Sequence, residues 1–147
     1  MNNSEAKYIR YRYPIRIRYA DTDKMGFAYN GNYFKYFEIG RTELMRHFDL
    51  VYSELENLGY QLPLLEAHVY YYKAALYDDL IEIEAALDLN KIGPKIIFEY
   101  KIFRENELIA EGSTVHLFMK SDTKKACRPP KIFIEKINLV KNSLLNK

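Results

Sequence analysis

The chain has 147 residues, a net charge of +2 and 48% hydrophobic residues, which suits one folded domain and excludes a disordered or low-complexity chain. A single cysteine, Cys127, excludes an intramolecular disulfide framework. No apolar run approaches the ~20 residues that a membrane-spanning helix needs, and the N-terminus has no apolar signal segment. We therefore expect one soluble cytoplasmic domain over residues 1–147, with no integral membrane segment.

The charges are unevenly placed along the chain. Residues 1–18 carry a net +4, residues 19–119 a net −8 and residues 120–147 a net +6. Basic ends of this kind occur in proteins that bind polyanions or smaller phosphorylated ligands, and equally where a strand and a helix are simply solvated. Sites that bind single-stranded nucleic acid interleave aromatic and basic residues. The C-terminal basic run has only one aromatic residue, Phe133. We expect no nucleic-acid partner.

The first half of the chain predicts a strand, a loop and two helices. Residues 13–20 alternate apolar residues with arginine, which indicates a strand with one polar face. Residues 21–32 are rich in Asp, Gly and Asn and predict a loop. Apolar residues then recur every three or four positions, which predicts a helix that begins at Asn30 or Asn32, either of which could cap it. They are Tyr33, Phe37, Gly40, Leu44 and Phe48, with Phe34 and Met45 beside them. Residues 51–59 predict a short second helix.

The second half predicts four strands and a last helix. The strands are expected at residues 68–77, 80–89, 95–104 and 108–120, with turns at 91–94 and 105–107. A helix is expected after Pro129 and Pro130. Consecutive strands joined by short turns form an antiparallel sheet, and one long apolar helix against such a sheet makes a two-layer α+β domain.

Several common catalytic motifs are absent from the sequence. It contains no phosphate-binding glycine motif, no HExxH, no CxxC and no GxSxG. His47, His68 and His116 are scattered without metal-ligand spacing, so we interpret them as structural and expect no metal. Cys127 has basic neighbours that would favour a thiolate, but no histidine lies close in sequence. We do not expect it to be a nucleophile.

The densest feature is the segment 19–33, where two carboxylates and two glycines precede the long helix. Such a segment is also what a plain turn and helix cap look like, because Asp favours turns and Asn caps helices. The functional interpretation has a mechanism. A helix N-terminus offers unpaired N–H groups that stabilise an oxyanion, and an upstream carboxylate could activate water or attack directly. Hydrolysis of an activated acyl group needs those two parts.

The same segment resembles the opening signature of the 4-hydroxybenzoyl-CoA thioesterase family, and most closely its branch of small bacterial acyl-CoA thioester hydrolases associated with the Tol-Pal envelope genes. The resemblance covers about residues 12–135 and includes an Asp-Asp pair before a strand at 78–79. It implies the hot-dog fold, in which an antiparallel sheet of about five strands wraps a long helix. The matching residues are Tyr19, Asp21, Thr22, Asp23, Gly26, Tyr29, Tyr33, Phe37, Glu38, Arg41, Thr42 and Glu43.

The resemblance also implies roles for individual residues. Asp23 falls on the family's catalytic carboxylate, acting as general base or as nucleophile. The backbone N–H of Asn30 would polarise the thioester carbonyl, with Gly31 in the first helical turn. Gly26 would let the backbone approach the substrate, since it lacks a Cβ. The resemblance implies active sites at a dimer interface, and a homodimer or homotetramer. Asp21 is expected to orient the loop.

The expected substrate is an acyl-CoA, with acyl carrier protein as the alternative carrier. Coenzyme A belongs to the substrate, so no cofactor is expected. The phosphates of coenzyme A give the C-terminal basic segment a candidate ligand, held by Lys124, Lys125 and Arg128. The acyl group would lie between the long helix and the sheet, near Phe27, Tyr29 and Tyr33.

One departure from the family pattern leaves alternatives open. The Tol-Pal branch usually has His where this chain has Asn30, whereas the branch that acts on aromatic acyl-CoAs lacks that His. A thiolate leaves readily, so a carboxylate and an oxyanion site suffice for hydrolysis. The alternative is a non-catalytic module that binds acyl-CoA or acyl carrier protein. A hydratase on the same architecture needs a His near the helix start, and none lies between residues 17 and 46.

Overall fold

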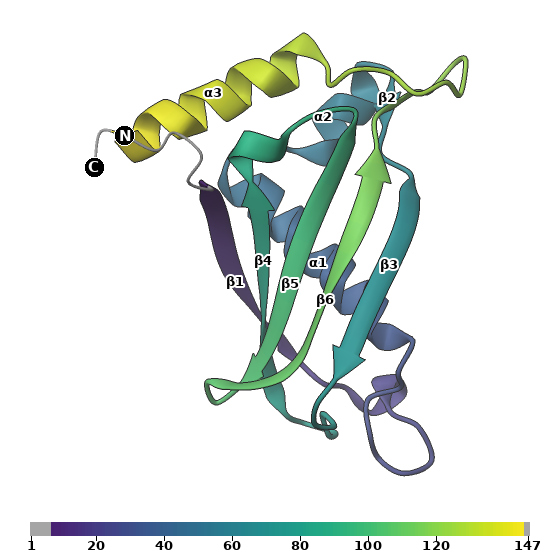
Figure 1. The fold of residues 1–147 in the computed structure, drawn as a ribbon. Helices are drawn as coiled ribbons and strands as arrows, with labels where there is room; N and C mark the ends of the chain where they lie inside the picture. The colour runs from purple at the N-terminus through teal and green to yellow at the C-terminus, as the bar shows by residue number, and fades with distance from the viewer. Residues whose placement is uncertain (1–6, 146–147) are drawn as a thin grey trace.

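One long helix lies along one face of a five-stranded antiparallel sheet in the computed structural model, which describes residues 7–145 (Figure 1). The long helix is α1 (Asn32–His47). The strands lie in the order β1-β4-β5-β6-β3, and all four neighbouring pairs are antiparallel. Their bounds are β1 (Tyr8–Arg16), β3 (Leu64–Tyr71), β4 (Leu80–Asp88), β5 (Lys95–Arg104) and β6 (Glu107–Leu117). This architecture confirms the predicted hot-dog fold.

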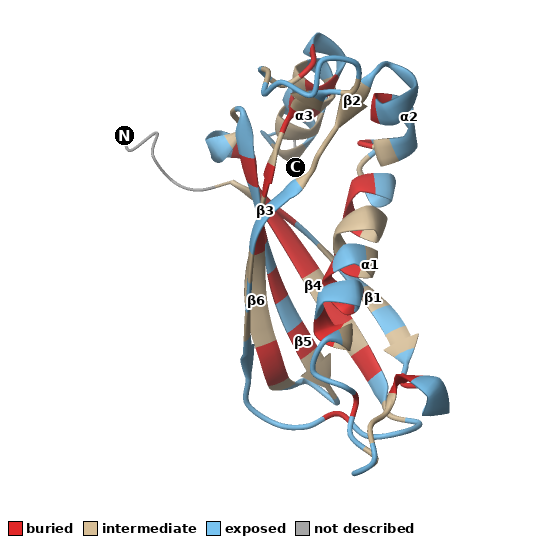
Figure 2. Ribbon diagram, turned by 90° about the vertical axis from the view of Figure 1, so that its right-hand side faces the viewer, coloured by how far each residue is buried: buried red, intermediate tan, exposed pale blue. Residues whose placement is uncertain are grey.

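Helix α1 buries most of the stripe that the periodicity predicts, but Phe34, predicted to widen it, is 39% exposed. Tyr33, Phe37 and Leu44 are each at most 2% exposed, and Figure 2 shows buried residues of α1 on its sheet-facing side. Gly40 lets helix and sheet approach closely, because a Cβ there would lie 2.6 Å from Cγ2 of Ile83 on β4. The sheet contributes its own alternating apolar face, so helix and sheet share one core.

The first strand corrects the prediction of residues 13–20. β1 runs from Tyr8 to Arg16, and a short 3₁₀ helix, η1 (Tyr19–Asp21), follows it. Tyr19 is 78% exposed instead of facing the core. The alternation of apolar and arginine residues extends back to Ile9, and pairing with β4 decides which part of it becomes strand. Arg12 lies opposite Glu84 there and forms an ion pair with it at 3.0 Å.

The edge strand β3 also differs from its predicted range. It covers Leu64–Tyr71, and residues 72–79 form an irregular segment before β4. The predicted strand at 95–104 coincides with β5. Between β5 and β6, Glu105 and Asn106 both have positive φ angles, of 51° and 66°. A two-residue hairpin turn requires that geometry, and asparagine tolerates it well.

Short elements and the last helix gather at one end of the sheet. They are α2 (Tyr52–Asn57), the two-stranded pair of β2 (Tyr60–Gln61) with β7 (Met119–Lys120), a 3₁₀ helix η2 (Leu89–Lys91) and α3 (Lys131–Leu145). Phe133 of α3 packs edge-to-face on Phe118, with ring centroids 5.1 Å apart. Within residues 7–145, no helix is long and apolar enough to cross a membrane.

Candidate active site

A tight hairpin leads into the N-terminus of α1, and we call residues 21–31 the site loop. The Tyr29 N–H donates to the Asp21 carbonyl at 2.8 Å, and the Asp23 N–H donates to the Phe27 carbonyl at 2.8 Å. Gly26 turns the chain with a φ of 80°, a conformation that costs glycine little. The hairpin places Asp23 and the start of α1 on one compact loop.

Asp21 anchors the site loop to α1. Its side chain is buried and accepts a hydrogen bond from the Arg18 N–H at 3.1 Å. Arg18 Nε lies 3.6 Å and Lys35 Nζ 3.7 Å from its carboxylate oxygens. The Asn32 side chain donates to the Asp21 carbonyl at 2.7 Å. Asn32 therefore reaches back to the loop instead of capping α1 as predicted, and Gly31 occupies the N-cap position without a side-chain cap.

Asp23 is arranged differently from Asp21. It is half-buried, and its Oδ1 atom accepts hydrogen bonds from the Met25 N–H at 2.8 Å and the Phe27 N–H at 3.2 Å. These two bonds fix the orientation of the carboxylate. Within residues 7–145 no group donates to its Oδ2 atom. One oxygen is thus held by the loop and the other is available to water or substrate.

The two amides that directly precede α1 are also available. Neither the Asn30 N–H nor the Gly31 N–H donates a hydrogen bond to any group in the described part of the chain. Unpaired amides at a helix N-terminus carry positive partial charge and suit an anion. The Asn30 carbonyl is occupied, since it accepts from the Tyr71 hydroxyl at 2.8 Å and from the Tyr33 N–H at 3.3 Å.

A cavity of about 150 Å³ opens beside Asn30, and Gly31 does not line it. Phe27 and Tyr33, both predicted to lie near the acyl group, line it together with Asn30, Tyr71 and Lys73. Tyr29 is 59% exposed and does not line the cavity. Its ring lies over Gly31 instead, where an added Cβ would come within 2.8 Å of Tyr29 Cε2.

The segment 72–79 supports the site loop from the sheet side. The Ala28 N–H donates to the Ala75 carbonyl at 2.7 Å, and Phe27 forms an isolated β-bridge with Leu76. The Tyr77 N–H contacts the Gly26 carbonyl at 3.4 Å. The position of the site loop therefore depends on that of segment 72–79.

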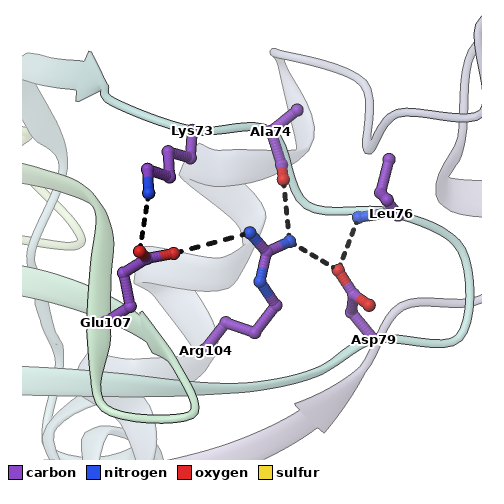
Figure 3. A network of polar contacts seen from close by, with 6 residues as sticks. All are labelled: Lys73, Ala74, Leu76, Asp79, Arg104 and Glu107. Carbon is purple, nitrogen blue, oxygen red and sulfur yellow. Dashed lines mark hydrogen bonds and ion pairs between the residues drawn. The ribbon is translucent and has the colours of Figure 1, made fainter.

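A network of ion pairs holds segment 72–79 in turn (Figure 3). At its centre, the Arg104 guanidinium at the end of β5 donates to the Asp79 carboxylate at 2.8 Å and to the Ala74 carbonyl at 2.9 Å. Asp79 accepts from the Leu76 N–H at 2.9 Å. Glu107 lies between Arg104, at 3.7 Å, and Lys73, at 2.6 Å. Lys73 and Arg104 lower the pKa of the Glu107 carboxyl.

The predicted phosphate-binding residues lie elsewhere in the chain. Lys124, Lys125 and Arg128 are exposed in the segment between β7 and α3, at the end of the sheet opposite the site loop (Figure 1). Lys124 Nζ donates to the side chain of Gln61 at 3.2 Å. One chain therefore does not bring these three residues together with Asp23, and their role stays a prediction.

The histidines lie away from the site loop. His116 is buried near the other end of α1, where its ring contacts Thr114 Oγ1 at 2.9 Å and the Leu62 carbonyl at 3.2 Å. Burial and the nearby Arg41 charge lower the pKa of His116 to about 4. His47 stacks on Tyr11 with ring centroids 4.3 Å apart. Residues 7–145 contain no group of three or more His, Cys, Asp or Glu side chains placed to hold a metal.

Three residues that support the site loop were not predicted from the sequence: Tyr71, Asp79 and Arg104. The run of tyrosines at 70–72 suggests only a strand, and Arg104 is separated from its partners by 25 and 30 positions. The Asp-Asp pair at 78–79 was the available signal, and it marks the residue that Arg104 holds.

Comparison with known proteins supports the same family. The acyl-CoA thioesterase YbgC of Haemophilus influenzae is 32% identical over 108 residues, covering 71% of this chain and 76% of that protein. The acyl-CoA thioester hydrolase YbgC of Escherichia coli is 30% identical over 106 residues, covering 71% and 78%. Among solved structures, a DHNA-CoA thioesterase of Staphylococcus aureus matches with a TM-score of 0.82 and 29% identity over 93% of each chain.

A model of the thioesterase-like superfamily matches residues 17–137, which include the site loop, α1 and the whole of β3 to β6. Four of the five strands of the sheet and the hairpin before α1 fall inside the matched region, and β1 precedes it. The chain belongs to the thioesterase-like superfamily.

Proposed function

We propose that this protein hydrolyses acyl-CoA thioesters to a free acid and coenzyme A. The observation that carries the proposal is the placement of two complementary groups on one loop. Asp23 has one carboxylate oxygen without a hydrogen-bond donor among residues 7–145, and the amides of Asn30 and Gly31 are unpaired in the same part of the chain. The relatives named as acyl-CoA thioesterases agree with this chemistry.

The reaction needs a nucleophile on one side of the carbonyl carbon and positive charge at its oxygen. The Asn30 N–H, with Gly31 beside it, would donate to the thioester oxygen as negative charge develops there. Asp23 would either take a proton from the attacking water or attack the carbon itself, giving an anhydride that water then opens. The C–S bond breaks and coenzyme A leaves as a thiolate, which needs no strong acid because a thiol has a pKa near 8.5.

The cavity beside Asn30 is the proposed acyl site. Phe27 and Tyr33 line it, so an acyl group whose carbonyl meets the helix N-terminus would contact aromatic rings. Gly26 supports this approach by forming the turn of the hairpin without a side chain. Tyr29 belongs to the rim of the site, since its ring is largely exposed.

We propose further that the working form is a homodimer, or a tetramer made of two dimers. The outer edge of β3 is unpaired within the described chain, and the strand exposes the apolar residues Leu64 and Leu65. Natural proteins rarely leave such an edge uncovered. Two copies joined antiparallel along β3 would bring the partner's basic segment toward the site loop, because the twofold axis exchanges the two ends of the sheet. Lys124, Lys125 and Arg128 would then bind coenzyme A phosphates from the second subunit.

Release of free thiol from a panel of short, long and aromatic acyl-CoAs tests the proposed reaction. We expect hydrolysis by the wild type, and a kcat lower by roughly a thousandfold for Asp23→Asn, which keeps the shape but loses the charge. Asp49→Asn is a matched control at the other end of α1, because asparagine tolerates its φ of 59°. Thermal stabilisation by acyl-CoA without turnover would instead identify a binding module, and turnover only with acylated acyl carrier protein would identify the other carrier.

Mixing two damaged variants tests the shared site. Asp23→Asn has an intact basic segment, and the double variant Lys125→Glu/Arg128→Glu has an intact carboxylate. If the site combines two subunits, a heterodimer of the two variants contains one complete site, and activity returns on mixing. Activity that stays at the level of the separate variants, although mass measurement shows heterodimers, would contradict the shared site. A mass near 17.5 kDa in solution would contradict the dimer.

A further inference from the structure

Tyr71 reaches from the edge strand to the start of α1. It is the last residue of β3, and its hydroxyl donates to the Asn30 carbonyl at 2.8 Å. Its ring packs edge-to-face on Tyr33, with centroids 4.9 Å apart. Burial raises the pKa of Tyr71, so the phenol remains protonated at neutral pH and can donate to a carbonyl. A side chain of the sheet is thus joined to the peptide that precedes the helix.

The Asn30–Gly31 peptide has one occupied side and one available side. No peptide bond in residues 7–145 is cis, so the Gly31 N–H points opposite to the Asn30 carbonyl. The carbonyl is held by Tyr71 at 2.8 Å and, less closely, by the Tyr33 N–H at 3.3 Å. The N–H has no acceptor in that part of the chain. Because the peptide is planar, holding its oxygen also fixes the direction of its N–H.

We propose that Tyr71 is a positioning residue for thioester hydrolysis, and that its hydroxyl directs the Gly31 N–H toward the thioester oxygen as a second donor beside the Asn30 N–H. This inference rests on the proposed function of the site loop. Tyr71 itself touches the Asn30 carbonyl, and it acts on the reaction only through the peptide plane. Preorganised amides stabilise an oxyanion because they need not reorient when its charge develops.

Other contacts at the helix start would not replace this bond. Gly31 is the N-cap residue and has no side chain, and no side chain among residues 7–145 caps the helix. Without the Tyr71 hydroxyl, the Asn30 carbonyl retains only the 3.3 Å contact from the Tyr33 N–H. Helix termini fray readily when their polar groups lack partners. The peptide would then sample orientations in which the Gly31 N–H points away from the substrate.

Tyr71→Phe removes the hydroxyl and keeps the ring against Tyr33. We expect kcat to fall about tenfold with KM changed less than twofold, the size expected for one neutral hydrogen bond that acts in the transition state. The matched control is Tyr52→Phe, which loses a tyrosine contact to a backbone group, the Leu62 N–H at 3.3 Å, near the other end of α1. The control should keep its kcat. Equal kcat values for the two variants, or a change confined to KM, would overturn the inference.

A spectroscopic readout separates positioning from a general loss of stability. In ¹H–¹⁵N spectra of the ligand-free protein, Tyr71→Phe should shift the Gly31 amide more than the Ala28 amide, whose bond to the Ala75 carbonyl is retained. An unmoved Gly31 resonance would overturn the proposed coupling.

Asp23→Asn distinguishes a failure of the positioning role of Tyr71 from a failure of the proposed hydrolysis mechanism. If it abolishes hydrolysis while Tyr71→Phe is fully active, only the positioning role fails; if it retains full rate, the proposed mechanism itself fails.

Discussion

The two ends of helix α1 differ in whether the polar groups around them have hydrogen-bond partners. At the N-terminal end, a carboxylate oxygen and two amides are left without partners among residues 7–145. Toward the C-terminal end, buried polar side chains are joined in a continuous chain that ends on a backbone carbonyl. Buried polar groups are normally satisfied because leaving them unpaired is costly. At the N-terminal end the unpaired groups are exposed or half-buried, so water or a substrate can reach them, and a reaction is to be expected there.

In the hydrogen-bonded chain toward the C-terminal end of α1, only one arrangement of the hydrogen atoms lets every contact be a hydrogen bond. The Leu62 carbonyl can only accept, so His116 Nδ1 donates to it. The other ring nitrogen then accepts from Thr114 Oγ1 at 2.9 Å, and Thr114 accepts from the Tyr100 hydroxyl at 2.6 Å. Each donor finds one acceptor, which makes this chain a source of stability instead of reactivity.

The largest expected effect on stability is a pH dependence that arises from His116, toward the C-terminal end of α1. The pKa of His116 is about 4 in the folded protein against an ordinary 6.5, so the unfolded chain binds a proton between these values and the folded chain does not. Stability is therefore fully present above pH 6.5 and is lost as the pH falls toward 4, by about 3 kcal/mol. Urea unfolding at several pH values checks this.

The control for that experiment is His116→Phe, whose unfolding free energy should lose this component of the pH slope. The carboxyl groups titrate in both proteins, so the difference between the two curves isolates the histidine. Curves that stay parallel from pH 7 to pH 4 would mean that His116 does not cause the slope.

Interrupting the same chain should also be costly. Thr114→Val removes the hydroxyl that joins Tyr100 to His116 and leaves two buried polar atoms without partners. We expect the free energy of unfolding to fall by about 2 kcal/mol, with kcat of the folded enzyme changed less than twofold. Denaturant unfolding and initial rates from one preparation test both parts. A large loss of kcat with an unchanged free energy of unfolding would show that this end of α1 serves the reaction and not stability.

Loosening the support of the site loop should affect the rate more than the stability. Arg104→Met removes the ion pair to Asp79 and the bond to the Ala74 carbonyl. We expect about a tenfold loss of kcat/KM, because segment 72–79 no longer holds the loop in place. Arg12→Met is the matched control, since it breaks the 3.0 Å ion pair between Arg12 on β1 and Glu84 on β4. Similar kcat/KM values for the two variants would argue against the support.

The smallest expected effect comes from a methyl group at the helix start. Gly31→Ala places a Cβ within 2.8 Å of the Tyr29 ring, which is exposed enough to move aside. We expect kcat/KM to fall two- to fivefold, since the methyl group narrows access to the amides. The free energy of unfolding should fall by about 0.5 kcal/mol or less. Gly93→Ala, where an added Cβ meets nothing within 4 Å, serves as the control. A rate loss as large in the control would show that the effect is not local.

The sequence predicts the parts of this molecule that depend on local pattern. The period of three and four residues identifies the buried face of α1, and the alternation at 95–104 coincides with β5. The alternation near the N-terminus is longer than one strand, so only pairing with β4 determines that β1 ends at Arg16. Phe34, predicted to widen the stripe, is 39% exposed, whereas Tyr36 is buried.

For the site, the sequence indicates the reacting groups but not their supports. Asp23 and the two amides that precede α1, those of Asn30 and Gly31, lie within nine residues and form one recognisable segment. Tyr71 reaches Asn30 across 41 positions, and Arg104 reaches Asp79 across 25. Contacts over such separations leave no periodic pattern, because each depends on how the sheet brings its strands together.

The hairpin before α1 also divides neighbouring amides into two classes of hydrogen exchange. The amides of Ala28 and Tyr29 are bonded to carbonyls at 2.7 and 2.8 Å, whereas those of Asn30 and Gly31 have no acceptor within residues 7–145. Exchange with deuterium in the first pair requires the hairpin to open, but in the second pair it requires only access of solvent. The boundary between slow and fast exchange therefore falls between residues 29 and 30. Protection that appears at residues 30 and 31 when a ligand is added would report occupancy of the site directly.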